Sequence, residues 1–319
     1  MHEVKYGNFA GMNLHKLSVF FISLIIFSGC STTENKNKSL TIVTTTGILG
    51  DCVTQIVDGQ AEVISIMGAG VDPHLYKASQ GDISKLSEAD IIVYNGLHLE
   101  GKMAQMLKNF SKTKPVFAIG DYIKKADLKR VDNTSDLVDP HVWFSPNLWL
   151  ESLHGIAKEL EKQNGLDSIL KNYQDYAIKV QSTKTNLQQL LDEELDSNQR
   201  ILITSHDAFE YFGDAFKFKV RGLQGISTTA EFGTKDIKDL TDFIIENQIK
   251  AVFVETSVPN KNLEAVVASA QARDYSIRIG GTLYSDALGE KNTPGGTYEG
   301  MLISNIKTII EGLKCYHPQ

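Results

Sequence analysis

The tripeptide Asp-Pro-His occurs twice in this chain, at residues 72–74 and 139–141, each time in a stretch that predicts a loop. Proline fixes its own φ and restricts the residue before it, so the histidine that follows starts from a stiff backbone. Imidazoles that are already in place suit a metal ion, which needs its ligands positioned before it arrives. His74 and His141 are therefore the first two candidate metal ligands.

Two further candidates follow later predicted strands, His206 in the segment TSHDAF and Asp286 in YSDALG. Three imidazoles and one carboxylate would form a complete shell for a divalent ion such as Zn²⁺ or Mn²⁺. Taken alone, His206 could belong to a helix start and Asp286 to a turn. Neighbouring candidates are 65 to 80 residues apart, which is too far for a finger-type motif, so only the fold could bring them together.

The chain from residue 40 onward predicts α/β architecture, because short β-rich runs alternate with helical patterns. The alternation is interrupted once, between about Leu166 and Leu195, where apolar residues recur every three or four positions. That spacing predicts one continuous amphipathic helix shared by two lobes, and a coiled-coil dimer segment is the alternative. We expect two (β/α)4-type lobes with parallel sheets, at residues 40–164 and 198–319, joined by a long rigid linker helix at 165–197.

The four candidates all follow predicted strands, two in each lobe. In open α/β sheets, binding sites form beyond the carboxyl ends of the strands. If the lobes face each other, the candidates can meet in the cleft between them. Glu255 ends a further strand at the same edge, and we expect it to orient a ligand histidine through a hydrogen bond.

The first thirty residues have the pattern of an export signal: Lys16 precedes an apolar run to Phe27, followed by Ser-Gly-Cys. The run is shorter than the roughly twenty residues that span a bilayer. We expect a signal peptide at residues 1–29, lipidation of Cys30 in a lipobox-like sequence, and a flexible polar tether at 30–39. The alternative is a plain cleaved signal. Whether Cys52 pairs with Cys315 stays open.

The charge of the chain and the motifs that it lacks argue against nucleic-acid binding and against three common kinds of catalytic or nucleotide site. The net charge is −7 and the lysines and arginines are scattered, so a nucleic-acid partner is not expected. The chain has no Gly-x-Ser-x-Gly, P-loop or His-Glu-x-x-His motif.

Seven segments of the chain resemble a known family, the metal-binding solute-binding lipoproteins of bacterial ABC importers, cluster A-I, and most closely its TroA-like members. The segments are GVDPHLY, ADIIVYNGLHLE, DPHVWFSP, SHDAFEYF, GISTTAE, VFVETSVPNKNLE and GGTLYSDALG…GGTYEGM. The resemblance implies two lobes, one long helix and a single metal bound by His74, His141, His206 and Asp286. Residues 121–139 lack the histidines of many zinc-specific members, whereas His206 stands where many manganese-specific members have glutamate.

The resemblance implies a receptor and not an enzyme. It predicts a monomeric, exported protein, lipid-anchored in the periplasm or on the outer face of the membrane. This protein would capture Zn²⁺ or Mn²⁺ for an ABC permease and its ATPase. Two alternatives are a periplasmic zinc metallohydrolase, with Glu255 as a possible base, and a surface adhesin whose metal is structural.

Overall fold

The computed structural model describes residues 1–4, 7, 39–131 and 136–314. Most of the predicted signal segment, Cys30, Cys315 and nearly all of the tether lie outside these ranges. The described residues from 39 to 314 belong to one compact unit. Within the described ranges, no helix has both the length and the apolar character that a membrane span requires.

The first lobe contains a parallel four-stranded sheet in the order β2-β1-β3-β4. Its strands are β1 (Leu40–Thr44), β2 (Ala61–Ser65), β3 (Ile91–Tyr94) and β4 (Val116–Ala118). Its helices are α2 (Gly47–Val57), α3 (Gln80–Glu88), α4 (Ala104–Phe110) and α5 (Pro146–Glu161), with short 3₁₀ turns η1 (Ile119–Tyr122), η2 (Lys125–Asp127) and η3 (Val142–Phe144).

The second lobe repeats this design with a parallel sheet in the order β6-β5-β7-β8. Its strands are β5 (Ile201–His206), β6 (Lys219–Gln224), β7 (Ala251–Glu255) and β8 (Arg278–Leu283). Its helices are α7 (Glu210–Phe216), α8 (Thr234–Glu246), α9 (Lys261–Gln271) and α10 (Tyr298–Lys314), after the turn η4 (Ser197–Gln199). The two parallel sheets with their helices confirm the predicted fold class.

Both sheets are covered on two faces, and successive strand residues enter different cores, as the twofold period of a strand requires. In β1, Val43 packs with the residues of α3 and α4, whereas Ile42 packs with those of α2 and α5. In β7, Val252 packs with α8 and α9, whereas Phe253 joins the same large core as Ile42. That large core extends through both lobes and connects them.

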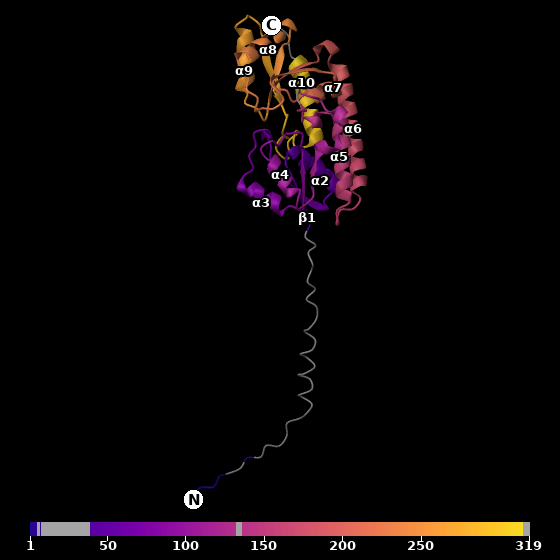
Figure 1. Cartoon of the computed structure of the whole chain (residues 1–319), viewed down its shortest axis with the longest axis vertical. Coiled ribbons are helices and arrows are strands. Elements are labelled where there is room, and N and C mark those ends of the chain that lie inside the picture. Colours follow the sequence, from indigo (N-terminus) through magenta and orange to yellow (C-terminus); the bar gives the residue numbers. More distant parts are fainter. Residues whose placement is uncertain (5–6, 8–38, 132–135, 315–319) are drawn as a thin grey trace. The chain divides into compact units, whose positions relative to one another are not determined.

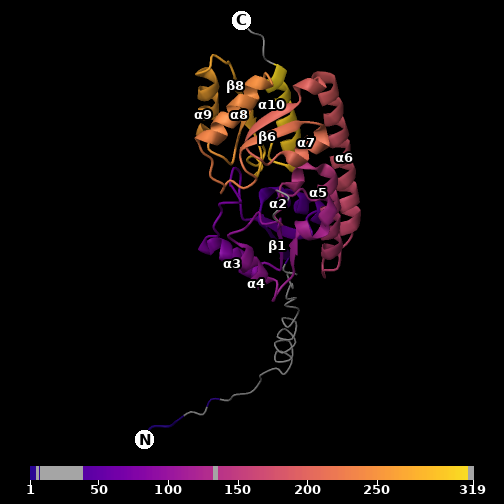
Figure 2. The ribbon, with the colours of Figure 1, turned by 45° about the horizontal axis from the view of Figure 1, so that its top comes forward.

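The long helix α6 (Ile169–Glu194) is about 39 Å long at 1.5 Å per residue. It contacts α2, α5 and α10, and it runs beside both lobes (Figures 1 and 2). Its apolar stripe, which includes Val180 and Leu187, packs in the large core of this chain, so the stripe is used within the chain and not in a coiled coil. Ile178 lies off this stripe and is 69% exposed. The helix begins three residues later than the sequence predicts, because Ser168 has a left-handed φ of 58°.

Cys52 connects its own helix, α2, with α5 of the first lobe and with the linker helix α6. Its buried sulfur accepts a hydrogen bond from Trp149 Nε1 at 3.3 Å and lies 3.3 Å from the Tyr176 hydroxyl. The thiol is free. Cys52 is therefore a packed core residue of α2, with partners on α5 and α6.

Candidate metal centre

The structure brings the four predicted residues to one point. His74 lies in the loop after β2, His141 directly before η3, His206 at the end of β5, and Asp286 three residues beyond β8. All four are buried, and each offers a ligand atom that lies within 4.8 Å of the others. The carboxyl ends of both sheets therefore meet at this group, hereafter the His₃Asp cluster.

The distances within the His₃Asp cluster match a single small cation. Nε2 of His74 and Nε2 of His141 are 3.3 Å apart. The Asp286 carboxylate oxygens lie 3.4 Å from Nε2 of His141 and 3.4 Å from Nε2 of His206. Tetrahedral zinc with bonds of about 2.0–2.1 Å places its ligand atoms about 3.3–3.4 Å from one another. These three spacings, two of which use different oxygens of Asp286, are close to the edges of a tetrahedral shell. Nε2 of His74 lies 3.9 Å from Asp286 Oδ2, so the shell is wider on the side of His74.

Three atoms of the cluster are buried without a hydrogen-bond partner among the described residues: His206 Nε2 and both carboxylate oxygens of Asp286. Buried polar atoms are nearly always partnered in folded proteins, because an unpartnered one keeps the full cost of its desolvation. A cation bound between them would satisfy all three. The donor set and its orphaned atoms thus fit a metal ion.

In two of the ligand histidines, a buried carboxylate contacts Nδ1, the ring nitrogen on the side away from the cluster. Asp139 Oδ1 lies 2.6 Å from His141 Nδ1, and Glu255 Oε2 lies 2.6 Å from His206 Nδ1. A ring that donates Nδ1–H to a carboxylate keeps its Nε2 lone pair free for a metal, and the bond fixes the orientation of the ring.

The sequence predicted the hydrogen bond of Glu255 but missed that of Asp139. The place of Glu255 at the end of a strand predicts its bond, and Glu255 also accepts the backbone N–H of His206 at 2.9 Å. The sequence pattern places Asp139 only in the loop tripeptide. The signal that could have found it is an aspartate two residues before the ligand, which can bond the backbone two positions on. Here Asp139 Oδ1 accepts the His141 N–H at 2.9 Å as well as the ring.

The close approach of two strands positions His206. Gly222 of β6 lies beside the end of β5, where an added Cβ would be only 2.5 Å from the Asp207 nitrogen and 2.6 Å from the His206 carbonyl carbon. Any other residue would push the strands apart, so glycine is required for this register. The position of His206 thus depends on β6 as well as on β5.

Opposing charges dominate the electrostatics of the cluster. Burial disfavours protonated His141, but the Asp139 and Asp286 carboxylates outweigh burial and raise the pKa of His141 to about 9. The same competition, with Glu255 and Asp286, raises the pKa of His206 well above its usual range. Burial would raise the pKa of Asp286, but the charges of His206 and His141 hold it well below its usual range. A buried anion is therefore matched by positive charge, which protons supply when a metal does not.

His74 behaves differently from the other two histidines. Burial lowers the pKa of His74 to about 3, since the attraction of Asp286 is opposed by the charges of His141 and His206. The imidazole of His74 is therefore neutral at physiological pH, as a metal ligand must be. It is also the most exposed of the four residues, at 6% against 0–1% for the others.

Trp143 shields the cluster on one side. Its ring centroid lies 5.2 Å from that of His141, and its Nε1 donates to the carbonyl of Ser285 in the other lobe at 3.0 Å. Trp143 is 1% exposed and forms an apolar wall of the cluster. It thereby keeps water from the cluster and strengthens the electrostatic interactions there.

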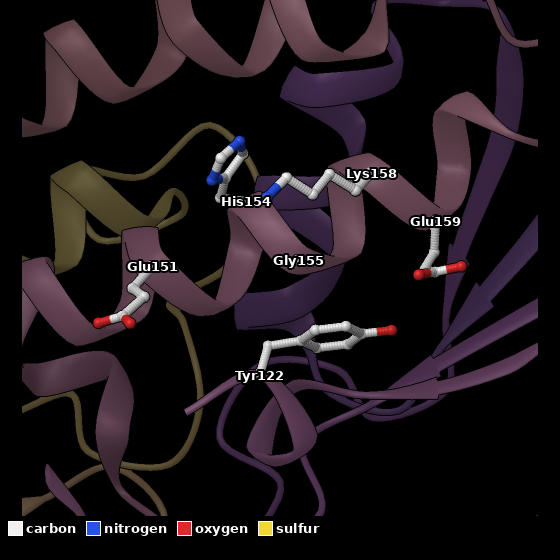
Figure 3. Close-up of a pocket in the computed structure, with 6 residues that line it drawn as sticks. All are labelled: Tyr122, Glu151, His154, Gly155, Lys158 and Glu159. Atoms are coloured by element: carbon white, nitrogen blue, oxygen red, sulfur yellow. The ribbon is translucent and has the colours of Figure 1, made fainter. Parts of the chain in front are cut away.

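A surface pocket elsewhere in the first lobe has no share in this chemistry. It is lined by residues of α5, among them Glu151, His154 and Glu159, and by Tyr122 of η1, whose ring lies beside this helix (Figure 3). Glu151 and His154 point away from each other, and His154 stacks on Tyr173 at 5.0 Å. None of the pocket residues belongs to the His₃Asp cluster.

Comparison with known proteins places this chain in a family. The chain is 41% identical over 304 residues to "Manganese-binding lipoprotein MntA" of Bacillus subtilis, covering 93% of this chain and 98% of that protein. It is 28% identical over 311 residues to "Manganese ABC transporter substrate-binding lipoprotein PsaA" of Streptococcus pneumoniae, covering 94% and 98%.

A solved structure shares the fold. The periplasmic zinc-binding protein TroA of Treponema pallidum superimposes with a TM-score of 0.82 at 39% identity, covering 86% of this chain and 99% of that one. The family described as "ZnuA: Zinc-uptake complex component A periplasmic" matches residues 42–312. The chain therefore belongs to the ZnuA family of metal-binding solute-binding proteins.

Proposed function

We propose that this chain is the solute-binding component of an ABC importer, which captures one Zn²⁺ or Mn²⁺ ion as cargo and delivers it to a permease driven by an ATPase. His74, His141, His206 and Asp286 are the proposed ligands. The observation that carries the proposal is the gathering of these four buried residues, from both lobes, within 4.8 Å of one another.

The closed ligand shell argues for a carrier over an enzyme. Catalytic zinc sites use three protein ligands and leave a position open for water, whereas four protein ligands complete a tetrahedral shell. The candidate base of the hydrolase alternative, Glu255, has both carboxylate oxygens bonded to His206. Glu255 is therefore committed to orienting a ligand.

The ligand set is compatible with both zinc and manganese. Imidazole-rich shells suit zinc, and a carboxylate that can bind through both oxygens also admits manganese. Relatives are named for each metal. Zinc binds most nitrogen and oxygen sites more tightly than manganese, so the cargo in the cell is decided by supply as well as by affinity.

We further propose that the chain is exported and works as a monomer tethered to a membrane. Residues 1–29 would be the signal peptide, Cys30 the lipidated residue, and 30–39 the tether to lobes at 40–164 and 198–319 that the 165–197 segment joins. The names of the relatives MntA and PsaA, both lipoproteins, support this. Metabolic labelling with a fatty-acid analogue should mark the wild-type protein and leave Cys30→Ser unlabelled.

Metal accumulation in cells tests the proposed function. In a strain that lacks the gene, the wild-type chain should restore uptake of radioactive zinc or manganese under chelation. A His141→Ala/Asp286→Ala variant, expressed to the same level, should not. Restoration of uptake by the double variant would contradict the proposal, as would unchanged uptake after gene deletion, which is the outcome that the adhesin alternative predicts.

A further inference from the structure

The exposure of the ligands shows on which side the His₃Asp cluster can be reached. His141, His206 and Asp286 are 0–1% exposed, whereas His74 is 6% exposed. The cluster is therefore least covered on the side of His74, which makes that side the shortest entrance for an ion. The loop that carries His74, between β2 and α3, forms one wall of this entrance.

One side chain ties this loop to the opposite lobe. Asp72 Oδ1 accepts the backbone N–H of His74 at 2.8 Å. Asp72 Oδ2 accepts the hydroxyl of Thr228 at 2.6 Å, across 156 positions of the chain. A hydroxyl donating to a carboxylate at this distance is a charge-assisted hydrogen bond of the stronger kind. The carboxylate that holds the backbone of His74 thus also grips the second lobe.

Thr228 lies in the connection between β6 and α8, at residues 225–233, which has neither helix nor strand. The connection has hydrogen bonds of its own, from the Ala230 nitrogen to the Ser227 carbonyl at 2.9 Å and between the Ser227 and Thr229 hydroxyls at 2.7 Å. These bonds do not involve the hydroxyl of Thr228. The connection can therefore keep its local structure when the bond to Asp72 breaks.

Two other bonds between the lobes are deeper. Trp143 Nε1 donates to the Ser285 carbonyl, and the Tyr298 hydroxyl donates to the Trp143 carbonyl, all between buried residues. The Asp72–Thr228 bond joins two half-buried residues, as does the ion pair of Lys129 with Glu210. It differs from that ion pair because Asp72 is two positions from the most exposed ligand. It lies where a small separation of loops would open the entrance while the deeper contacts stay.

We infer that the Asp72–Thr228 hydrogen bond is a latch on the metal entrance, which limits how fast the ion enters and leaves. The inference rests on the proposed function. Thr228 is outside the ligand set, so loss of its hydroxyl should lower the barrier without changing the bound ligand shell. Entry and release should then accelerate together, and the Kd should stay nearly constant. Thr228 acts as a positioning residue, because it works through the loop of His74.

Stopped-flow kinetics on the full mature protein test the latch, with zinc as the probe and a chromophoric chelator to follow release. Thr228→Val keeps the shape of the side chain and removes the hydroxyl. We expect entry and release to be about tenfold faster, the order expected when one hydrogen bond to a charged group is lost from a barrier. Thr228→Ser keeps the hydroxyl and should stay within about twofold of wild type. Thr229→Val is the matched control, since Thr229 is exposed and bonds only within its loop.

Several outcomes would overturn the latch: unchanged rates in Thr228→Val, equal acceleration by Thr228→Ser or Thr229→Val, or faster release with unaltered entry. Thr228→Ala replaces the valine variant if circular dichroism shows that the latter is unfolded. Failure of the wild-type protein to bind zinc or manganese would instead contradict the proposed function. Wild-type binding with unchanged variant rates contradicts the latch alone.

Discussion

The two Asp-Pro-His tripeptides have the same sequence and the same backbone bond, yet they act differently. In each, the aspartate Oδ1 accepts the N–H of the histidine, at 2.8 Å in the first copy and 2.9 Å in the second. In the second copy, Asp139 also contacts the ring of His141. In the first copy, the other oxygen of Asp72 bonds Thr228 of the opposite lobe.

This difference sets the protonation of the two histidines in opposite directions. The carboxylates of Asp139 and Asp286 raise the pKa of His141 to about 9 against the effect of burial, whereas burial and neighbouring charges lower the pKa of His74 to about 3. A short motif therefore determines the local backbone, while the fold decides what the free carboxylate oxygen and the ring will meet.

The largest effect is expected from loss of a ligand. His141→Ala should weaken zinc binding by more than about a hundredfold, beyond the 10–100-fold typical of losing an outer partner. Metal at a hundredfold excess over Kd stabilises the folded protein by about 2.7 kcal/mol. The rise in melting temperature that this causes should disappear in His141→Ala. Calorimetric titration and thermal melts measure both. The control is His98→Asn. His98 is exposed and lies outside the cluster, and asparagine tolerates its left-handed φ of 65°. This variant should bind zinc as the wild type does. Full occupancy in His141→Ala would remove it from the ligand set.

Matched substitutions in the two tripeptides sharpen the comparison. Asp139→Asn should weaken equilibrium zinc binding about 10–100-fold, because the ring of His141 loses its charged partner. Asp72→Asn should change the Kd by less than about threefold, because the ring of His74 does not depend on that carboxylate. Competition with a chelator of known affinity measures both. Equal losses in the two variants would show that the tripeptides are equivalent after all.

Binding should also depend on pH in a range set by His141. A metal must displace the proton of His141, so affinity should rise between pH 7 and about 9, by up to about tenfold per unit for each proton released. His74 contributes nothing there because its pKa is lowered. Titrations in buffers of different ionisation enthalpy count the released protons. Asp139→Asn should flatten the rise, and a flat profile in the wild-type protein would contradict the assignment.

The smallest effect concerns the stability of the metal-free protein. The pKa of His141 is higher in the folded state, about 9, than the ordinary 6.5. Its ion pairs therefore stabilise the fold fully below pH 6.5, and this contribution is lost as pH rises through about 9. The melting temperature of the metal-free protein should fall by a few degrees over this range, whereas that of Asp139→Asn should fall less. Differential scanning calorimetry with chelator present measures the difference.

The sequence predicted the parts of the site that depend on strand ends. The place of His206 at the end of β5 and of Asp286 just beyond β8 follows from the alternation of strands and helices, as does the bond of Glu255. The bond between Asp72 and Thr228 could not be predicted, because it joins two loops in different lobes. The start of α6 was missed for a local reason, the left-handed backbone of Ser168, which a non-glycine residue rarely adopts.

Anomalous diffraction from a crystal of the protein grown with zinc or manganese tests the central claim most directly. We predict one strong peak between the lobes, about 2.0–2.2 Å from Nε2 of His74, His141 and His206 and from a carboxylate oxygen of Asp286. A peak bound elsewhere, or no peak at these four side chains, would contradict the assignment of the His₃Asp cluster as the metal centre.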